Sequence, residues 1–436
     1  MTSNAPTERL ALEGLRVLDV TQVWAGPTCT KILADMGAQV IKVESAKRTD
    51  SSRGDALGTA GIYPDGEPGE RPWNRAGLHN DRNRSKVSVC LDLTHPKGVE
   101  TFKRLVAQCD VVTESFRNGV MDRFGLGYEA LKAVKPDIIM VSLSSQGGTG
   151  PERSYGSYGA TLEQTAGIAS LTGYLGGSPT TSGTFFPDPV VAMLGIGTIL
   201  AAVRQQRLTG RGTYIDLSQR EVTTSILGEM IMDYTMNGRT WGPMGNRHPV
   251  YAPQGVYLCA GDDAWIAITV RSDAEWAALA RAIGRDDLAT AEEFATAAAR
   301  RQRHDEVDSI ITQWTQMRPV REVMELLQSA RVPAGIAERG SEILADPHLN
   351  ARNFWETVDD PEGGRHTYLS RPFKFSKTPA ATRRHAPLLG EHTDQILRDV
   401  AGLTDAEIKE LDTLGVTAND PRAALQQDDD PPLRRQ

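Results

Sequence analysis

The chain has 436 residues, of which 39% are hydrophobic and 24% charged, so it has room for two or three domains and is too apolar to be disordered. Its 48 basic and 56 acidic residues leave a formal net charge of −8, which argues against nucleic acid as the main partner. The four cysteines, Cys29, Cys90, Cys109 and Cys259, form no CxxC pair, and we interpret them as free thiols in a reducing compartment.

Strand and helix patterns alternate through the first third of the chain. Runs of apolar and β-branched residues predict strands at 15–20, 40–43, 86–93, 110–113 and 137–141. Helices are expected from Gly26, from Pro96 and near 128–134. This alternation predicts βαβ units and a mostly parallel sheet, which is an α/β fold. Ligands of such sheets bind where the loops leave the carboxyl ends of the strands.

The pattern changes after residue 172. Residues 172–183 (TGYLGGSPTTSG) are rich in glycine and predict a loop, and a long apolar helix is expected from about Pro189 to Arg204. Its apolar core, 190–203, has 14 residues, whereas a membrane span needs about 20. The polar N-terminus has no apolar centre typical of a signal peptide. We therefore expect a cytoplasmic protein that binds no membrane.

Polar residues near 230–253 separate a second region. Alternation at 256–270 predicts antiparallel strands, and 274–327 is expected to be mostly helical. We place a smaller domain at 230–335.

Common cofactor motifs are absent from the sequence. There is no GxGxxG after the first strand, and no GxxxxGK[ST], HExxH or GxSxG. No clustered His and Cys spacing indicates a metal site, so we predict neither a metal nor a tightly bound cofactor. Arg82, Arg84 and Lys86 form a basic stretch that either holds phosphates or is a solvated surface.

Two carboxylates flank the glycine-rich loop. Glu163 lies on a predicted helix, and Asp188 directly precedes the long apolar helix, whose N-terminus favours a negative charge. Each residue also has a structural interpretation, Asp188 as a helix N-cap and Glu163 as a solvated helix residue.

Several segments together resemble the class III coenzyme A transferases, the family of formyl-CoA transferase, carnitine CoA-transferase and α-methylacyl-CoA racemase. The matching segments are LEGLRVLDVTQVWAGPTCTKILADMGAQVIKVES (12–45), NRSKVSVCLDLTHPKGVETFKRL (83–105), ESFRNGVMDRFGLGYEAL (114–131), TGRGTYIDLSQRE (209–221), GNRHP (245–249) and APLLGEH (386–392). They follow the family's order across nearly the whole chain.

The resemblance implies a large Rossmann-like α/β domain formed by both chain ends, 1–229 and 336–436, with the smaller α+β domain between them. It also implies an interlocked dimer, and we expect a disordered tail from about 426. Family enzymes move coenzyme A from an acyl-CoA donor to a carboxylic acid. An enzyme carboxylate attacks the donor thioester, and an anhydride and then an enzyme–CoA thioester follow. Acyl-CoA and an acid are therefore the expected small-molecule partners.

The resemblance also assigns residues to the coenzyme A site. Those assigned are Trp24, Ala25, Leu91, Asp92, Leu93, Thr94, Ser115, Phe116, Arg117, Arg123, Ser144 and Ser145. Leu91 to Thr94 would hold the adenine end, and the two serines would lie beside the pantetheine arm. Arg123 is the expected phosphate contact, because a guanidinium matches phosphate geometry.

The chemical centre departs from the family's pattern. Aligning the TG-x-x-D-G loop of the transferases with 172–177 (TGYLGG) puts Gly176 at the position of the nucleophilic aspartate. The racemases use an aspartate and a histidine. In this chain, Asp188 is at the position of that aspartate, but Tyr158 is at the position of the histidine. A tyrosine with a pKa of about 10 is a poor base at neutral pH.

Several readings follow from this departure. In the first, another carboxylate replaces the aspartate, with Glu163 as the first candidate and Asp188 as the second. In the second, the chain is the non-nucleophilic subunit of a heteromer with an aspartate-bearing paralogue, rather than a homodimer. An acyl-CoA racemase or epimerase, or a protein that only binds CoA thioesters, is a weaker alternative.

Overall fold

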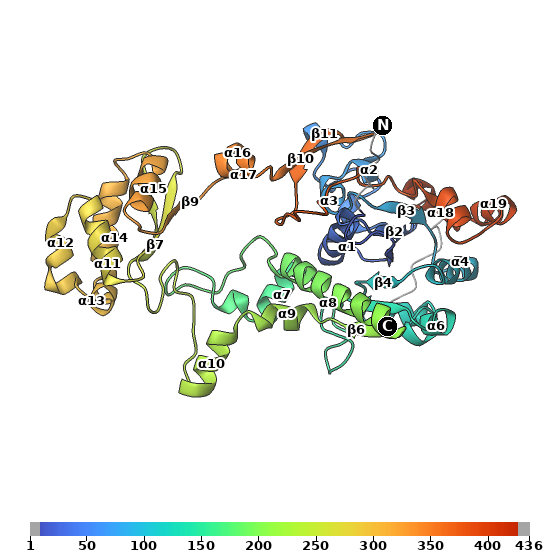
Figure 1. Cartoon of the computed structure of the whole chain (residues 1–436), viewed down its shortest axis with the longest axis horizontal. Coiled ribbons are helices and arrows are strands. Elements are labelled where there is room, and N and C mark those ends of the chain that lie inside the picture. The colour runs from blue at the N-terminus through green and yellow to red at the C-terminus, as the bar shows by residue number, and fades with distance from the viewer. Residues whose placement is uncertain (1–8, 426–436) are drawn as a thin grey trace, which may run out of the picture. The chain divides into compact units, whose positions relative to one another are not determined.

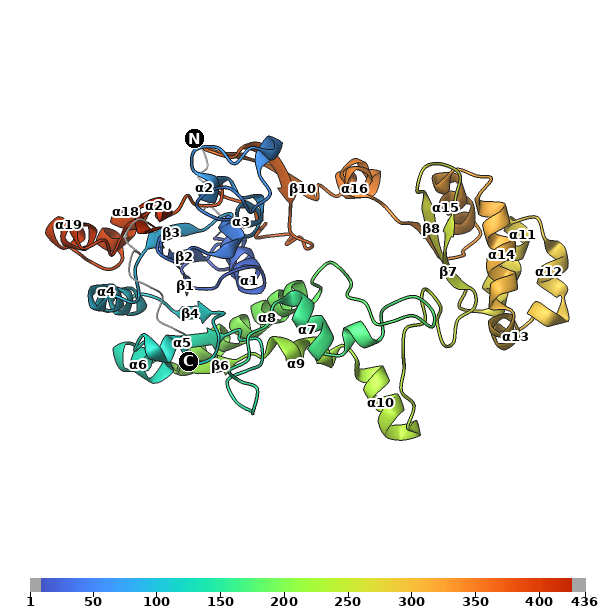
Figure 2. The ribbon, with the colours of Figure 1, turned by 180° about the vertical axis from the view of Figure 1, so that it is seen from behind.

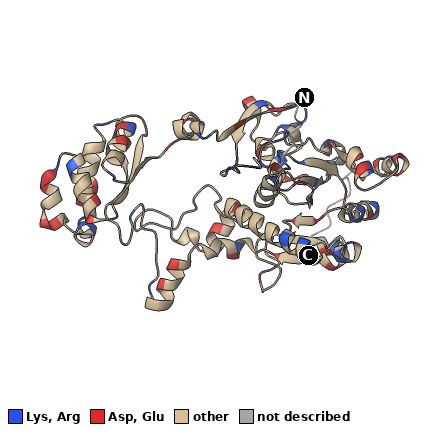
Figure 3. Ribbon diagram, viewed as in Figure 1, with Lys and Arg blue, Asp and Glu red and all other residues tan. Residues whose placement is uncertain are grey.

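The computed structural model describes residues 9–425, so the expected disordered tail lies outside the described residues. The chain divides into two compact units (Figure 1). The first contains the described residues up to Ile168, Ser182–Met232 and those from Asn353 onward, and the second contains Ala169–Thr181 and Asp233–Arg352. Lys, Arg, Asp and Glu occur along the helices of both units (Figure 3).

A six-stranded parallel sheet is the centre of the first unit, in the order β3-β2-β1-β4-β5-β6. Its strands are β1 (Arg16–Asp19), β2 (Gln39–Glu44), β3 (Val87–Cys90), β4 (Val111–Glu114), β5 (Ile139–Ser142) and β6 (Thr213–Asp216). The predicted α/β fold with a parallel sheet is confirmed. The last strand was not predicted, because its four residues alternate between half-buried and exposed and form no apolar run.

Helices cover both faces of this sheet (Figures 1 and 2). They are α1 (Ala25–Asp35), α2 (Pro72–Arg75), α3 (Gly77–Arg82), α4 (Pro96–Val106), α5 (Val120–Arg123), α6 (Tyr128–Val134), α7 (Gly159–Thr165), α8 (Pro187–Thr209), α9 (Gln219–Ser225), α18 (Thr393–Asp399), α19 (Asp405–Thr413) and α20 (Pro421–Leu425). A hairpin of β10 (Trp355–Asp360) and β11 (Gly364–Leu369) also belongs to this unit. The helix α10 (Gly228–Asn237) crosses the boundary between the units.

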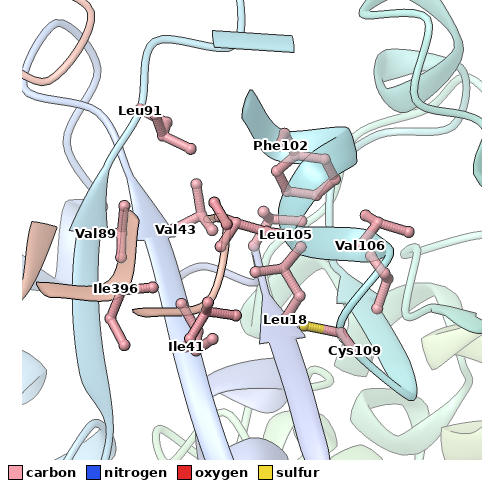
Figure 4. Close-up of a cluster of buried hydrophobic side chains, with 14 of the residues drawn as sticks. Leu18, Ile41, Val43, Val89, Leu91, Phe102, Leu105, Val106, Cys109 and Ile396 are labelled. Carbon is pink, nitrogen blue, oxygen red and sulfur yellow. The ribbon is translucent and has the colours of Figure 1, made fainter. Parts of the chain in front are cut away.

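One face of the sheet is buried by α4, α6, α18 and α19 (Figure 4). Leu18, Ile41 and Val43 of the sheet pack in one cluster with Phe102 of α4 and Ile396 of α18. The C-terminal part of the chain therefore completes a core that the N-terminal strands begin.

The opposite face is buried by α1 and α8, with Val17 and Ile139 of the sheet in the same cluster. Gly195 of α8 lies so close to α1 that a Cβ atom there would come 3.2 Å from the Cys29 sulfur. Among residues 9–425, α8 alone is long and apolar enough to cross a membrane. Val191, Ala192, Ile199, Ala202 and Val203 of α8 are buried in this core, whereas Met193 and Leu194 are exposed.

The second unit has a three-stranded antiparallel sheet, β7 (Gln254–Leu258), β8 (Trp265–Thr269) and β9 (Ala334–Ile336). Its helices are α11 (Asp273–Ala282), α12 (Asp286–Thr290), α13 (Ala297–Gln302), α14 (His304–Thr315), α15 (Val320–Ser329), α16 (Gly340–Ala345) and α17 (Pro347–Ala351). The predicted antiparallel strands and helical stretch are confirmed. Trp276 and Ile266 are buried at the centre of the unit's own core.

Candidate active site

The segments assigned to coenzyme A by resemblance follow four strands of the parallel sheet. Leu91–Thr94 follows β3, Trp24 and Ala25 follow β1, Ser115–Arg117 follows β4, and Ser144 and Ser145 follow β5. Because parallel strands end at the same edge, the fold brings these segments to one edge of the sheet. Their contact with coenzyme A stays a prediction.

The loops after β1 and β4 meet at the switch point of the sheet, where the strand order reverses. The backbone N–H of Gln22 donates to the Ser115 hydroxyl at 2.9 Å. On the next residue, the Phe116 N–H donates to the Glu114 carboxylate at 2.7 Å. Burial raises the pKa of Glu114 to about 7, so this acid at the strand end is half protonated at neutral pH.

The other assigned residues differ in whether their polar groups already form hydrogen bonds or ion pairs within the chain. Asp92 accepts hydrogen bonds from the N–H and hydroxyl of Thr94 and lies 2.8 Å from the Lys47 ammonium, so it fixes its own turn. The Ser144 hydroxyl is buried and has no hydrogen-bond partner among residues 9–425. Arg117 and Arg123 are exposed. We expect these two guanidinium groups to be free for an anionic ligand.

Val23 has an unusual backbone conformation in the loop after β1. Its φ is 71°, in the left-handed region that β-branched residues rarely adopt. Its N–H donates to the Asp50 carboxylate at 3.0 Å, and its carbonyl accepts from Arg82 at 3.1 Å. Strained residues persist where neighbouring groups fix them, and they cluster at functional sites.

Buried ion pairs lie beneath this loop. The Lys42 ammonium is 3.2 Å from the Asp50 carboxylate and donates to the Thr21 carbonyl at 2.8 Å. The Lys86 ammonium is 2.9 Å from Asp19. Burial alone would raise the pKa of Asp19, but Lys86 and Lys42 lower it to about 2, whereas burial lowers the pKa of Lys86 to about 8. Asp19 is therefore a fixed negative charge. Because it is fully buried, it is unsuited to nucleophilic attack.

Asp188 is the second residue of α8 and lies close to the start of α1. The backbone N–H of Ala25 lies close enough to its carboxylate to lower the carboxyl pKa. Burial raises the pKa of Asp188 to about 6, against the opposing effects of the Ala25 N–H and of Arg82. The side chain is 9% exposed, so it is shielded from water yet has an accessible edge. These are the properties that a carboxylate nucleophile needs.

Gly159, the first residue of α7, borders this carboxylate. A Cβ atom on Gly159 would come 2.5 Å from Asp188 Oδ2 and 2.6 Å from the Phe185 Cβ. The absence of a side chain at 159 therefore makes the space that Asp188 occupies.

Glu163 has a different environment. Its carboxylate is fully buried and accepts hydrogen bonds from the Ser182 N–H at 2.8 Å, the Ser182 hydroxyl at 2.6 Å and the Phe186 N–H at 3.0 Å. The interpretation of Glu163 as a solvated helix residue is wrong, because this carboxylate binds the segment that leads into α8. Its catalytic role stays a prediction.

Gly176 lies in the second unit, in a turn closed by a 2.8 Å hydrogen bond from the Gly177 N–H to the Tyr174 carbonyl. Its φ is +71° at the third position of this turn, where glycine is strongly favoured. The turn therefore accounts for a glycine at 176, and its correspondence to the family's aspartate stays a prediction.

The basic stretch is not a solvated surface. Lys86 and Arg84 are buried and Arg82 is 8% exposed. Each has partners within the chain: Lys86 pairs with Asp19, Arg84 covers the Tyr368 ring, and Arg82 covers the Trp24 ring. Lys86 and Arg84 are too deeply buried to bind a phosphate from solution, and phosphate binding by Arg82 stays a prediction.

Sequence reasoning missed the groups that fix the loop after β1. Asp50 lies 27 residues from Val23 in an irregular segment. Lys42 is on the buried strand β2, and nothing in the sequence around it indicates a contact with the loop. No spacing rule connects them. No group of three or more His, Cys, Asp or Glu residues within 9–425 has the arrangement of a metal site.

Comparison with known proteins agrees with this geometry. The model of CoA-transferase family III matches residues 12–393. Similar curated proteins include "Succinyl-CoA--D-citramalate CoA-transferase" of Chloroflexus aurantiacus, 33% identical over 94% of this chain and 98% of that protein. Formyl-CoA:oxalate CoA-transferase of Rhodopseudomonas palustris is 32% identical over 94% of this chain and 97% of that protein. The chain belongs to CoA-transferase family III, and it is a class III CoA-transferase.

Solved structures share the fold. A CaiB/BaiF family protein from Brucella suis has a TM-score of 0.79 and 31% identity. The match covers 90% of this chain and 100% of that chain. A Mycobacterium tuberculosis protein has a TM-score of 0.74 and 25% identity over 89% of this chain and 99% of that one.

Proposed function

We propose that the chain transfers coenzyme A from succinyl-CoA to a short dicarboxylic acid, with Asp188 as the nucleophile. The observation that carries the proposal is the carboxylate of Asp188, held by the Ala25 N–H at the start of two helices and raised in pKa to about 6 by burial. The names of similar proteins support the substrate class. They specify succinyl-CoA with D-citramalate, L-malate or mesaconate.

The reaction follows from a nucleophilic carboxylate. Asp188 attacks the thioester carbonyl of the donor, the C–S bond breaks, and coenzyme A leaves as the thiolate. The thiolate then attacks the aspartyl carbonyl of the anhydride and releases the donor acid, which leaves an enzyme–CoA thioester. The acceptor carboxylate attacks this thioester, and the released thiolate attacks the acceptor's acyl carbon in the new anhydride. The acceptor becomes an acyl-CoA and Asp188 is a free carboxylate again.

Asp188 is the better supported of the two predicted carboxylates. An exposed edge and a raised pKa favour attack by Asp188, whereas Glu163 has no exposed surface and both its oxygens accept hydrogen bonds. We propose Glu163 as a positioning residue for the segment before α8. With Asp188 as the nucleophile, the glycine at 176 leaves no gap in the chemistry.

The heteromer is the second candidate. One similar protein is named as the beta subunit of a succinyl-CoA:L-malate CoA-transferase, with 32% identity to this chain. The presence of Asp188 supports a chain that is active without a paralogue. The racemase alternative has little support, because Tyr158, at the position of the racemases' histidine, is 71% exposed.

The test is a transfer assay with the purified chain alone. Succinyl-CoA is incubated with citramalate, malate, mesaconate or glutarate, and the new CoA thioesters are separated by liquid chromatography. The proposal predicts a new thioester with at least one acid and none with Asp188→Asn. Activity that appears only after addition of a paralogous subunit would instead support the heteromer.

A further inference from the structure

Arg82 is the last residue of α3 and contacts the strained loop after β1. Its guanidinium carbon is 4.3 Å from the centre of the Trp24 ring, and Nη1 donates to the Val23 carbonyl at 3.1 Å. Its Nε–H is buried and has no hydrogen-bond partner among the described residues. A buried guanidinium with an unused donor is expensive to retain, which suggests a role beyond packing.

The two polar backbone groups of Val23 bind opposite charges. The Val23 N–H donates to the Asp50 carboxylate, which forms an ion pair with Lys42. The Val23 carbonyl accepts a hydrogen bond from Arg82. Two residues further along the chain, the Ala25 N–H lies close to Asp188 and lowers the pKa of its carboxylate. The direction of that N–H is set by the path of the loop, and Arg82 binds the loop at both Val23 and Trp24.

Arg82 also acts on Asp188 through charge. It is the one charged side chain within 9–425 whose effect on the Asp188 carboxylate is resolved, and it opposes the effect of burial. Asp81 and Asp50 are the other carboxylates that act on Arg82. Removal of the arginine would therefore leave burial unopposed except by the Ala25 N–H and the residue's own backbone N–H.

We propose that Arg82 is a positioning residue for coenzyme A transfer, which fixes the loop after β1 at Val23 and Trp24 and so sets the position of the Ala25 N–H beside Asp188. This inference rests on the proposed function, because it needs Asp188 as the nucleophile. Arg82 touches neither the reacting atoms nor, in this account, the acyl-CoA.

Arg84 provides a matched control. It is also buried, also covers an aromatic ring at 4.3 Å, that of Tyr368, and its Nε–H also lacks a partner among the described residues. Its hydrogen bonds go to Asp81 and to the Leu369 carbonyl, away from the loop. Loss of Arg84 thus carries a similar packing penalty without a change at Val23 or Asp188.

The experiment measures kcat/KM for succinyl-CoA against pH in the wild type, Arg82→Met, Arg82→Lys and Arg84→Met, with melting temperatures recorded for each. In the wild type, kcat/KM falls at low pH along an acid limb. We expect Arg82→Met to shift this acid limb to higher pH by roughly one unit and to lower kcat about tenfold or more. Arg82→Lys retains the charge, so its limb stays near that of the wild type while kcat falls. Arg84→Met lowers the melting temperature and leaves the limb in place.

The outcomes separate this inference from the proposed function. If Asp188→Asn is inactive but the acid limb of the kcat/KM profile does not move in Arg82→Met, the role of Arg82 alone is overturned. The same conclusion follows if the acid limb moves equally in Arg84→Met. Full activity of Asp188→Asn overturns the proposed function and this inference with it. If Arg82→Met does not fold, Arg82→Lys and Arg84→Lys are compared, and an equal fall in kcat overturns the inference.

Discussion

The backbone N–H of Ala25, in the first turn of α1, lies close to the carboxylate of Asp188, in the first turn of α8, and lowers its pKa. Both helices pack in the same core cluster beneath the sheet. The packing of the two helices and the path of the loop that leads into α1 therefore together set the position of this N–H relative to the carboxylate. Two helix N-termini also favour a negative charge there, although burial outweighs them and raises the pKa.

Replacement of the nucleophile gives the first prediction. Asp188→Asn retains the shape of the side chain but cannot form an anhydride, so we expect transfer to fall by at least about 10³-fold. The measurement is the initial rate of acyl-CoA formation at saturating succinyl-CoA. A loss of less than tenfold would show that another group attacks the thioester.

The same residue predicts the pH dependence of activity and of stability. Attack requires the ionised carboxylate, so kcat/KM should fall as the pH drops below about 6. The folded-state pKa lies above the unfolded value of 3.8, so ionisation of Asp188 destabilises the folded protein as the pH rises from about 4 to 6. Asp188→Asn should therefore be more stable than the wild type at pH 7.5, by roughly 2–3 kcal/mol, and no more stable near pH 4. Urea unfolding at both pH values measures this difference, and an equal difference at the two would contradict the assignment.

A single methyl group should disrupt the site. The Cβ of Gly159→Ala would lie 2.5 Å from Asp188 Oδ2, so the carboxylate must move and transfer should fall about 10²-fold. Gly197→Ala is the control, because this glycine is in the same helix as Asp188 and a Cβ there meets nothing within 4 Å. The control should be fully active and slightly more stable. Equal activity of the two variants would mean that Asp188 does not need its observed position.

The buried pair beneath the loop predicts a large loss of stability. Asp19→Asn leaves the fully buried Lys86 ammonium with only neutral acceptors, Pro27 and Asn83, and should lower the free energy of unfolding by about 3–5 kcal/mol. In the wild type, the contribution of Asp19 is present above pH 4 and is lost as the pH falls towards its folded-state pKa of about 2. The double variant Asp19→Asn with Lys86→Met should recover part of the loss. No recovery in urea unfolding would argue that the pair's charges are not the cause.

Glu163→Gln distinguishes the two carboxylates. The amide keeps one acceptor oxygen but loses the charge that binds the Ser182 and Phe186 N–H groups, so we expect a lower melting temperature and a partial loss of kcat. Coenzyme A should still be transferred. Complete inactivity in a folded protein would restore Glu163 as the nucleophile.

The first five strands of the parallel sheet and the helices α1, α4, α6 and α8 could be predicted because each has its own local signal. The run at 15–20 gave β1, and the pattern at 128–134 gave α6 with its observed bounds. The site was harder to predict. Arg82 has the composition of a surface residue, and only the fold shows that it lies against Trp24. The glycine at 176 suggested a missing aspartate, because a sequence does not distinguish a lost side chain from a turn that requires φ of +71°.

The most direct test of the central claim is to find the residue that carries coenzyme A. The wild-type chain is incubated with succinyl-CoA without an acceptor, quenched in acid, digested with pepsin, and its peptides are measured by mass spectrometry. We expect a CoA thioester on the peptide that contains Asp188, and no such peptide from Asp188→Asn. A CoA thioester on the peptide that contains Glu163, with none on Asp188, would contradict it.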